Sequence, residues 1–145
     1  KVTRKKKENY VQDDPALPMI TAASPLAEGP DADNPNIVKV VLTTTGDALY
    51  FSRSRIPYAR HPPALPCYRH LGVYGYSREF LLRFVVWPPS PLEMTESLEQ
   101  LRALENGARL RVVLTTDESP GVDPPEQARE VERAMVRGDA LPPGE

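Results

Sequence analysis

Proline is the feature that most limits how this chain can fold. Its 17 prolines, in 145 residues, gather at positions 14–35, 61–66 and 87–91 and near the C-terminus. Proline fixes φ and has no backbone donor, so such stretches are typical of connections between regular elements. We therefore predict that the strands and helices lie between them, in a single domain with its own core.

Apolar runs between these connections predict the strands. Residues 37–42 are β-branched and almost continuously apolar, as in a buried strand, and residues 109–114 (RLRVVL) predict another buried strand. Residues 19–23 are a weaker candidate. Residues 48–52 follow a turn at Gly46, which predicts a hairpin with the strand at 37–42.

Capping residues predict the helices. Ser77 is placed to cap a short helix, and residues 90–93 (SPLE) form a capping box that opens a second helix ending at Asn106 and Gly107. A last helix is predicted to open at Asp123. The predicted inner faces are Phe80, Leu81, Phe84 and Val85 in the first helix, and Met94, Leu98, Leu101 and Leu104 in the second. This alternation of elements predicts an α/β layered fold with a mixed sheet.

Residues 68–76 (YRHLGVYGY) read as a strand with polar groups on one face. Alternation places His70, Gly72, Tyr74 and Tyr76 on the same side, where the glycines at 72 and 75 would leave room. Two interpretations stay open at equal weight: a solvated aromatic face, or a surface that faces a ligand.

Composition narrows the class of protein. A formal charge of −2 and a pI near 5.8 argue against binding to nucleic acid or an anionic membrane, and the basic residues at 1–7 are interpreted as a solvated tail. We expect no membrane span and no secretory signal, since no long apolar run occurs. A single cysteine, Cys67, excludes an internal disulfide. These observations favour a cytoplasmic protein.

No P-loop, dinucleotide fingerprint, nucleophile elbow or paired-histidine metal motif occurs. The remaining candidates are polar residues at the ends of predicted elements: Arg53, Arg60, His70, Tyr74, Glu99, Gln100 and Asp123. Each has a simpler interpretation. The arginines can be solvated, Glu99 and Gln100 fall on the exposed side of their helix, and Asp123 has the position of an N-cap.

Several motifs together resemble a known family. They are NPNIVKVVL (34–42), ALYFSRSRIPY (48–58), RHLGVYGY (69–76), WPPSPLE (87–93), LEQLR (98–102) and PGVD (120–123). In this order they are similar to the 3-deoxy-manno-octulosonate cytidylyltransferases, or CMP-Kdo synthetases, from about residue 19 to residue 133. The resemblance implies a Rossmann-like nucleotidyltransferase fold, represented here by its C-terminal half with a β-hairpin that serves dimerisation.

The resemblance also implies a reaction. CTP and the acid sugar Kdo would give CMP-Kdo and pyrophosphate for lipopolysaccharide synthesis, by attack of the anomeric hydroxyl on the α-phosphate, in a homodimer that uses Mg²⁺. Kdo would be held by His70, Tyr74, Glu99, Gln100 and Arg60. Asp123 and Arg53 would be catalytic, and Asp123 and Asp14 would bind the metal.

The chain also departs from the family pattern. Nothing in residues 1–10 resembles the family's CTP-binding loop, and VQDDP (11–15) stands where VQGDEP is expected, which favours Asp14 over Asp13 as the metal ligand. We predict an irregular basic segment at 1–18, a sugar-binding and dimerising part at 19–137, and a flexible tail at 138–145. The alternatives are a catalytically silent fragment that binds sugar or only dimerises, and a cytidylyltransferase for another acid sugar such as a sialic acid.

Overall fold

The computed structural model describes residues 16–61 and 64–116. Its elements in chain order are β1 (Met19–Leu26), α1 (Pro30–Asp33), β2 (Lys39–Leu42), β3 (Ala48–Ser52), β4 (Cys67–Tyr76), α2 (Arg78–Phe84), α3 (Pro91–Glu96), α4 (Gln100–Glu105) and β5 (Leu110–Leu114). The chain divides into two compact units, residues 1–115 and 116–145, and these elements all belong to the first. The helix predicted to open at Asp123 lies outside the described residues.

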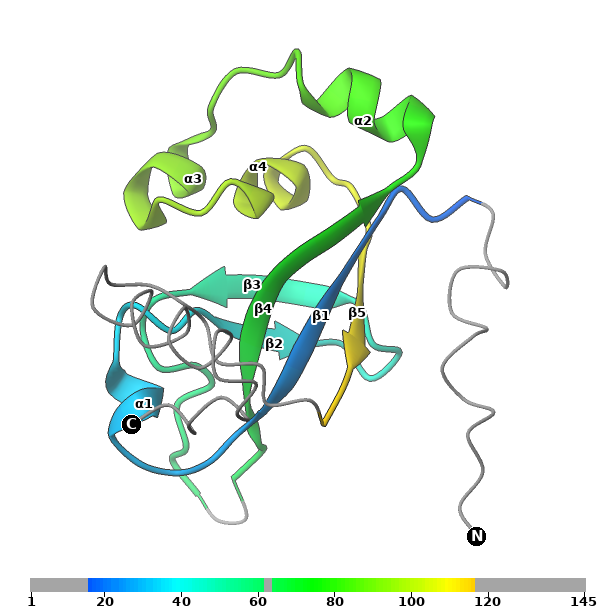
Figure 1. Ribbon diagram of the computed structural model, residues 1–145. Helices are drawn as coiled ribbons and strands as arrows, with labels where there is room; N and C mark the ends of the chain where they lie inside the picture. Colours follow the sequence, from blue (N-terminus) through cyan, green and yellow to red (C-terminus); the bar gives the residue numbers. More distant parts are fainter. Residues whose placement is uncertain (1–15, 62–63, 117–145) are drawn as a thin grey trace, which may run out of the picture. The chain divides into compact units, whose positions relative to one another are not determined.

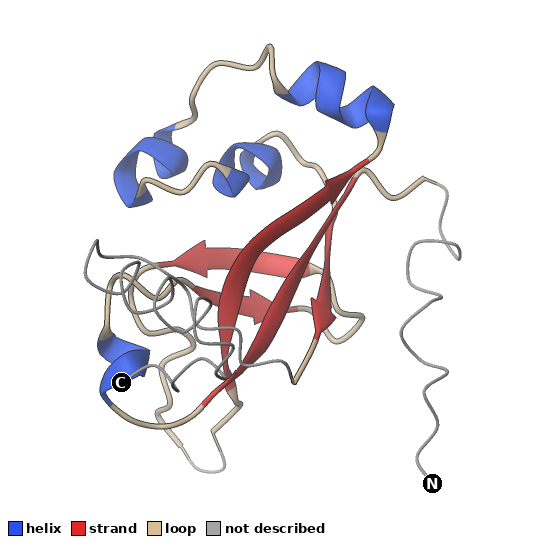
Figure 2. Ribbon diagram, viewed as in Figure 1, coloured by secondary structure: helices blue, strands red, loops and turns tan. Residues whose placement is uncertain are grey.

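The strands form one five-stranded sheet in the order β3-β2-β4-β1-β5 (Figure 1). Strand β1 runs parallel to β5 and antiparallel to β4, while β2 pairs antiparallel with both β3 and β4. Helices α2, α3 and α4 lie on one side of this sheet (Figure 2). The prediction of an α/β fold with a mixed sheet is confirmed.

The β2–β3 hairpin forms as predicted. The backbone N–H of Thr43 donates to the carbonyl of Asp47 at 2.8 Å, and Gly46 takes a positive φ of 91° in the turn. The Asp47 carboxylate then accepts a hydrogen bond from Nε of Arg111 at 2.6 Å, which ties the hairpin to β5. The role of this hairpin in dimerisation stays a prediction.

The core lies between the sheet and the helices. Its buried members include Met19, Val40, Phe51, Phe80, Phe84, Leu98, Leu101 and Leu110. Ser77 caps α2, since its Oγ accepts from the Phe80 N–H at 3.2 Å. The inner face of α2 is narrower than predicted, because Leu81 and Val85 are exposed. Within the described residues, no helix combines the length and apolar character needed to cross a membrane.

The prediction of one continuous helix from residue 91 to residue 106 is wrong, because the structure has two helices there. α3 ends at Glu96, Ser97 takes a left-handed conformation with φ of 54°, and α4 begins at Gln100. The predicted apolar stripe therefore does not lie on one face: Met94 in α3 is 64% exposed, while Leu101 in α4 is fully buried. The side chain of a distant residue, Arg53, binds the carbonyls of Glu96 and Ser97 at this break, as described below.

Candidate functional site

A row of rings crosses the helix-covered face of the sheet. His70, Tyr74 and Tyr76 share that face, with ring centroids 5.4 Å and 6.0 Å apart in succession. Phe51 meets the His70 ring edge-on at 4.9 Å at one end, and Phe80 stacks on Tyr76 at the other. The predicted alternation along this strand is therefore correct, and its polar groups lie between the sheet and the helices.

A bulge interrupts β4 inside this row. Thr21 of β1 pairs with Tyr74 and Ala23 pairs with His70, so the single residue between them on β1 faces residues 71–73 of β4. Gly72 lies in the bulge with a φ of 66°, which favours glycine. Gly75 has another reason, since a Cβ there would lie 2.7 Å from Cγ2 of Ile20. The two glycines thus serve the bulge and the opposite face of the sheet, rather than leaving room beside the rings.

The His70 imidazole is held in place by β1. Its Nε2 lies 2.9 Å from Oγ1 of Thr21, which is itself 3% exposed. Burial lowers the pKa of His70 from 6.5 to about 4. At neutral pH the ring is therefore an uncharged group that can both donate and accept hydrogen bonds.

Glu99 and Gln100 lie at the start of α4, where Glu99 is exposed and Gln100 is buried. Burial raises the pKa of Tyr74, and the charges of Tyr76 and Glu99 raise it further, so Tyr74 stays a neutral phenol. Glu99 also raises the pKa of Tyr76, after the effect of burial. Gln100 is only 5% exposed, although its position on an unbroken helix predicted exposure. The structure therefore places Tyr74 beside His70, while Glu99 is exposed and acts on the two phenols through its charge.

Arg53 has a different environment from the one predicted. Its Nε donates to the carbonyl of Glu96 at 2.7 Å, Nη2 to the carbonyl of Ser97 at 3.3 Å, and Nη1 to the carbonyl of Pro35 at 2.9 Å. The guanidinium takes up the carbonyls at the end of α3 and so fixes the break before α4. In the described structure Arg53 positions the backbone that carries Glu99 and Gln100.

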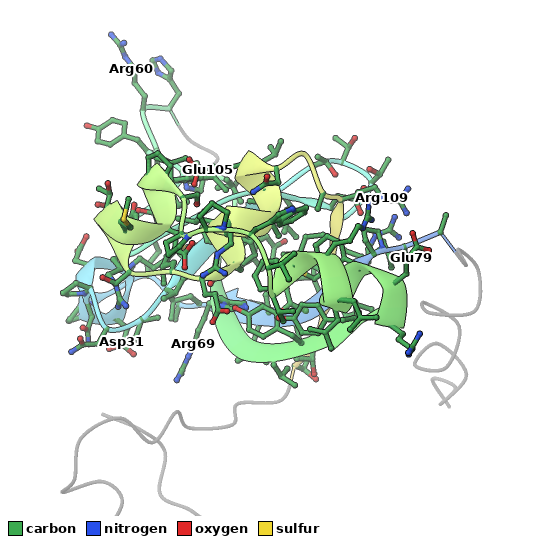
Figure 3. The ribbon with its side chains drawn as sticks, turned by 90° about the horizontal axis from the view of Figure 1, so that it is seen from above. Asp31, Arg60, Arg69, Glu79, Glu105 and Arg109 are labelled. Carbon is green, nitrogen blue, oxygen red and sulfur yellow. The ribbon has the colours of Figure 1, made fainter. Side chains whose placement is uncertain are left out.

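Of the three predicted residues that remain, the structure describes only Arg60. Arg60 is exposed, and Figure 3 shows its side chain extending away from the helices and strands. Asp14 and Asp123 lie outside the described residues. Within residues 16–61 and 64–116, no group of three or more His, Cys, Asp or Glu side chains gathers as a metal site.

Glu96 is a central residue that the sequence did not single out. Its carboxylate accepts from Oγ of Ser52 at 2.7 Å and from the backbone N–H of Arg53 at 2.9 Å. Burial raises the pKa of Glu96, but these hydrogen bonds, led by that of Arg53, lower it overall. Its partners are over 40 residues away in the sequence, so no local pattern predicts them.

We expect Glu96→Gln to lower the free energy of unfolding by about 1–2 kcal/mol, because three donors, Tyr50, Ser52 and the backbone of Arg53, lose a charged acceptor. Urea denaturation measures the change. Glu79→Gln is the matched control, since Glu79 is exposed in the first turn of α2, and it should change stability by less than about 0.5 kcal/mol. Equal effects of the two substitutions would contradict the role given to Glu96.

Comparison with known proteins identifies the family of this chain. A family model described as cytidylyltransferase matches residues 2–115. The chain belongs to the cytidylyltransferase family. The resemblance indicated by the sequence motifs is thereby confirmed.

Two curated relatives of this cytidylyltransferase are 3-deoxy-manno-octulosonate cytidylyltransferases. That of Syntrophotalea carbinolica is 47% identical over 137 residues, covering 88% of this chain and 54% of the relative. That of Chlorobaculum tepidum is 54% identical over 102 residues, covering 70% of this chain and 41% of the relative. The chain thus spans about half the length of the curated relatives it matches.

A solved structure gives the same picture of the fold. The CMP:2-keto-3-deoxy-manno-octonic acid synthetase complexed with CTP superposes with a TM-score of 0.80 at 40% sequence identity. The match covers 88% of this chain and 53% of that one. The ring row and the α3–α4 break thus occur in a chain with the cytidylyltransferase fold.

Proposed function

We propose that this chain forms the acid-sugar side of a CMP-Kdo synthetase, which joins CTP and Kdo to give CMP-Kdo and pyrophosphate. The observation that carries the proposal is the row that His70, Tyr74 and Tyr76 form on one face of a cytidylyltransferase fold. The relatives of known name, at 47% and 54% identity, support the same reaction.

The site offers groups suited to a polyhydroxylated ligand. His70 and Tyr74 are neutral at physiological pH, and each can exchange hydrogen bonds with sugar hydroxyls. The carboxylate of Glu99 accepts hydrogen bonds and repels another anion, so the carboxylate of the sugar would lie away from it. Together these groups would orient the anomeric hydroxyl toward the nucleotide.

The chemistry proposed for the bound substrates needs no covalent intermediate. The anomeric oxygen of Kdo forms a bond to the α-phosphorus of CTP, the bond to the pyrophosphate leaving group breaks, and the hydroxyl proton is lost to solvent or base. Catalysis of this kind depends mainly on positioning and on charge stabilisation. Mg²⁺ would supply part of that stabilisation, and Asp14 and Asp123 are the residues proposed to hold it.

Two further parts of the proposal concern the setting of the reaction. We extend it to a homodimer formed through the β2–β3 hairpin, which analytical ultracentrifugation of the full chain tests. Because CTP is a cytoplasmic nucleotide, the proposed reaction takes place in the cytoplasm.

Pyrophosphate release tests the proposed reaction. The full chain, with its mass of 16.2 kDa verified, is incubated with CTP, Kdo and Mg²⁺. Turnover that requires all three supports the proposal. Kdo binding without turnover would favour the catalytically silent alternative, which the half-length match motivates, and neither binding nor turnover would overturn both. Preference for a sialic acid in a substrate panel would replace Kdo as the substrate.

We expect His70→Ala to raise the Kdo concentration needed for half-maximal turnover by about tenfold, the effect of losing one well-placed hydrogen bond of about 1.4 kcal/mol. The concentration of CTP needed should stay unchanged, because His70 is assigned to the sugar alone. Steady-state kinetics with each substrate varied in turn measures both values. Equal losses for Kdo and CTP would contradict the assignment.

A further inference from the structure

The hydroxyl of Thr21 lies at the centre of a short hydrogen-bond relay. Oγ1 donates to the backbone carbonyl of Val73 at 2.7 Å and contacts Nε2 of His70 at 2.9 Å. Thr21 is buried in β1, and Val73 belongs to the bulge of β4. The relay therefore joins the bulge carbonyl, through the threonine, to the imidazole.

The direction of the relay follows from counting protons. A carbonyl oxygen only accepts, so the single proton of the Thr21 hydroxyl is committed to Val73. The contact with His70 must then have Nε2–H as the donor and Oγ1 as the acceptor. A neutral imidazole with its proton on Nε2 carries a lone pair on Nδ1.

The bulge explains why this carbonyl is the acceptor. Between the pairs Thr21–Tyr74 and Ala23–His70, β4 has more residues than β1, and the positive φ of Gly72 allows the excess chain to turn out of the regular ladder. The carbonyl of Val73 accepts from the threonine side chain in this irregular segment. Within residues 16–61 and 64–116, no hydrogen bond from the protein to Nδ1 of His70 accompanies that to Nε2.

We propose that Thr21 is a positioning residue for the acid-sugar site. It holds His70 as the Nε2–H tautomer, so that Nδ1 is presented as a hydrogen-bond acceptor that takes a hydroxyl of the sugar and rejects its carboxylate. This inference rests on the proposed function, because it concerns the ligand of the same site. It predicts that the hydroxyl of Thr21, and not merely its shape, sets the affinity for the sugar.

Nitrogen-15 NMR of the full chain labelled at histidine tests the tautomer directly. The sequence contains two histidines, so His61→Gln, which removes an exposed residue, assigns the signals. We expect protonated Nε2 and unprotonated Nδ1 for His70 at pH 7. Added Kdo should shift the Nδ1 resonance toward lower frequency, while the proton stays on Nε2. A proton on Nδ1 in the free protein would overturn the inference.

Thr21→Val and Thr21→Ser separate the hydroxyl from the shape of the side chain. Valine keeps the volume and removes the hydroxyl, and serine keeps the hydroxyl. We expect valine to weaken Kdo binding by about tenfold, the equivalent of one hydrogen bond, and serine to restore most of it, as measured by calorimetry. Equal affinities for wild type and valine would overturn the inference.

The two levels of the proposal fail differently. If the wild-type chain binds no Kdo, the proposed function is wrong, and the tautomer of His70 is still decided by NMR. If the chain binds Kdo but His70 carries its proton on Nδ1, the proposed function stands and the role of Thr21 is wrong. Should Thr21→Val fail to fold, the tautomer of the wild type and the affinity of Thr21→Ser still decide the matter: a Kdo affinity for serine far below that of wild type would contradict it.

Discussion

Replacing Lys39 by methionine is expected to lower the free energy of unfolding by about 3 kcal/mol or more. Lys39 is fully buried in β2, and its Nζ donates to the carbonyls of Asn34 at 2.9 Å, Ile37 at 2.7 Å and Arg53 at 2.5 Å. Methionine has a similar length but no donor. Each carbonyl left buried without a partner costs about 1–3 kcal/mol.

The position of these carbonyls explains why the loss should extend beyond β2. Two of the carbonyls come from the connection that precedes β2, and the third follows β3. One ammonium group therefore joins the segment that enters the hairpin to the segment that leaves it. Burial lowers the pKa of Lys39, so a charge that is costly to bury is retained only because it is fully hydrogen-bonded. The third carbonyl belongs to Arg53, which in turn fixes the α3–α4 break.

Urea denaturation of Lys39→Met measures this effect. Arg78→Met is the matched control, because it also replaces a long cation by methionine, but at an exposed position at the start of α2. We expect it to change stability by less than about 0.5 kcal/mol. A Lys39→Met protein as stable as the control would show that the three carbonyls find other donors.

Local patterns were sufficient for the strands and for the polar face of β4. The strand at 37–42 has a β-branched apolar run. Alternation alone placed His70, Tyr74 and Tyr76 on one face. The bulge does not change this, because it adds an even number of residues to β4 and side chains alternate with a period of two. Lys39 was part of that run, yet nothing local indicated that its ammonium is buried, since its partners come from other segments.

Long-range contacts explain what the sequence did not predict. The 90–106 segment has the capping box and apolar spacing of one helix, whereas the carbonyls at the break accept hydrogen bonds from the distant guanidinium of Arg53. That break buries Gln100, which an intact helix would expose. The resemblance identified Gln100 as a site residue without this geometry, whereas Thr21 and Glu96 belong to none of the motifs by which the resemblance was recognised.

Lowering the pH from 7 to 4 is expected to remove about 3 kcal/mol of stability through His70 alone. The folded protein lowers the pKa of this imidazole from 6.5 to about 4 by burial. Above pH 6.5 the ring is neutral in both states. Below it the unfolded chain takes up a proton that the folded chain does not, so stability falls with pH until about pH 4, at about 1.4 kcal/mol for each pH unit.

Carboxylates also titrate at the lower end of this range, since the pKa values of Glu93 and Glu96 are lowered in the folded protein and their stabilisation is lost in acid. The contribution of His70 is therefore the difference between wild type and His70→Gln, in urea denaturation at a series of pH values. That difference should change by about 3 kcal/mol between pH 7 and pH 4. His61→Gln, at an exposed position, should follow the wild type. Parallel curves for wild type and His70→Gln would mean that the imidazole titrates alike in both states, and the neutral acceptor proposed at Nδ1 would then be absent below pH 6.5.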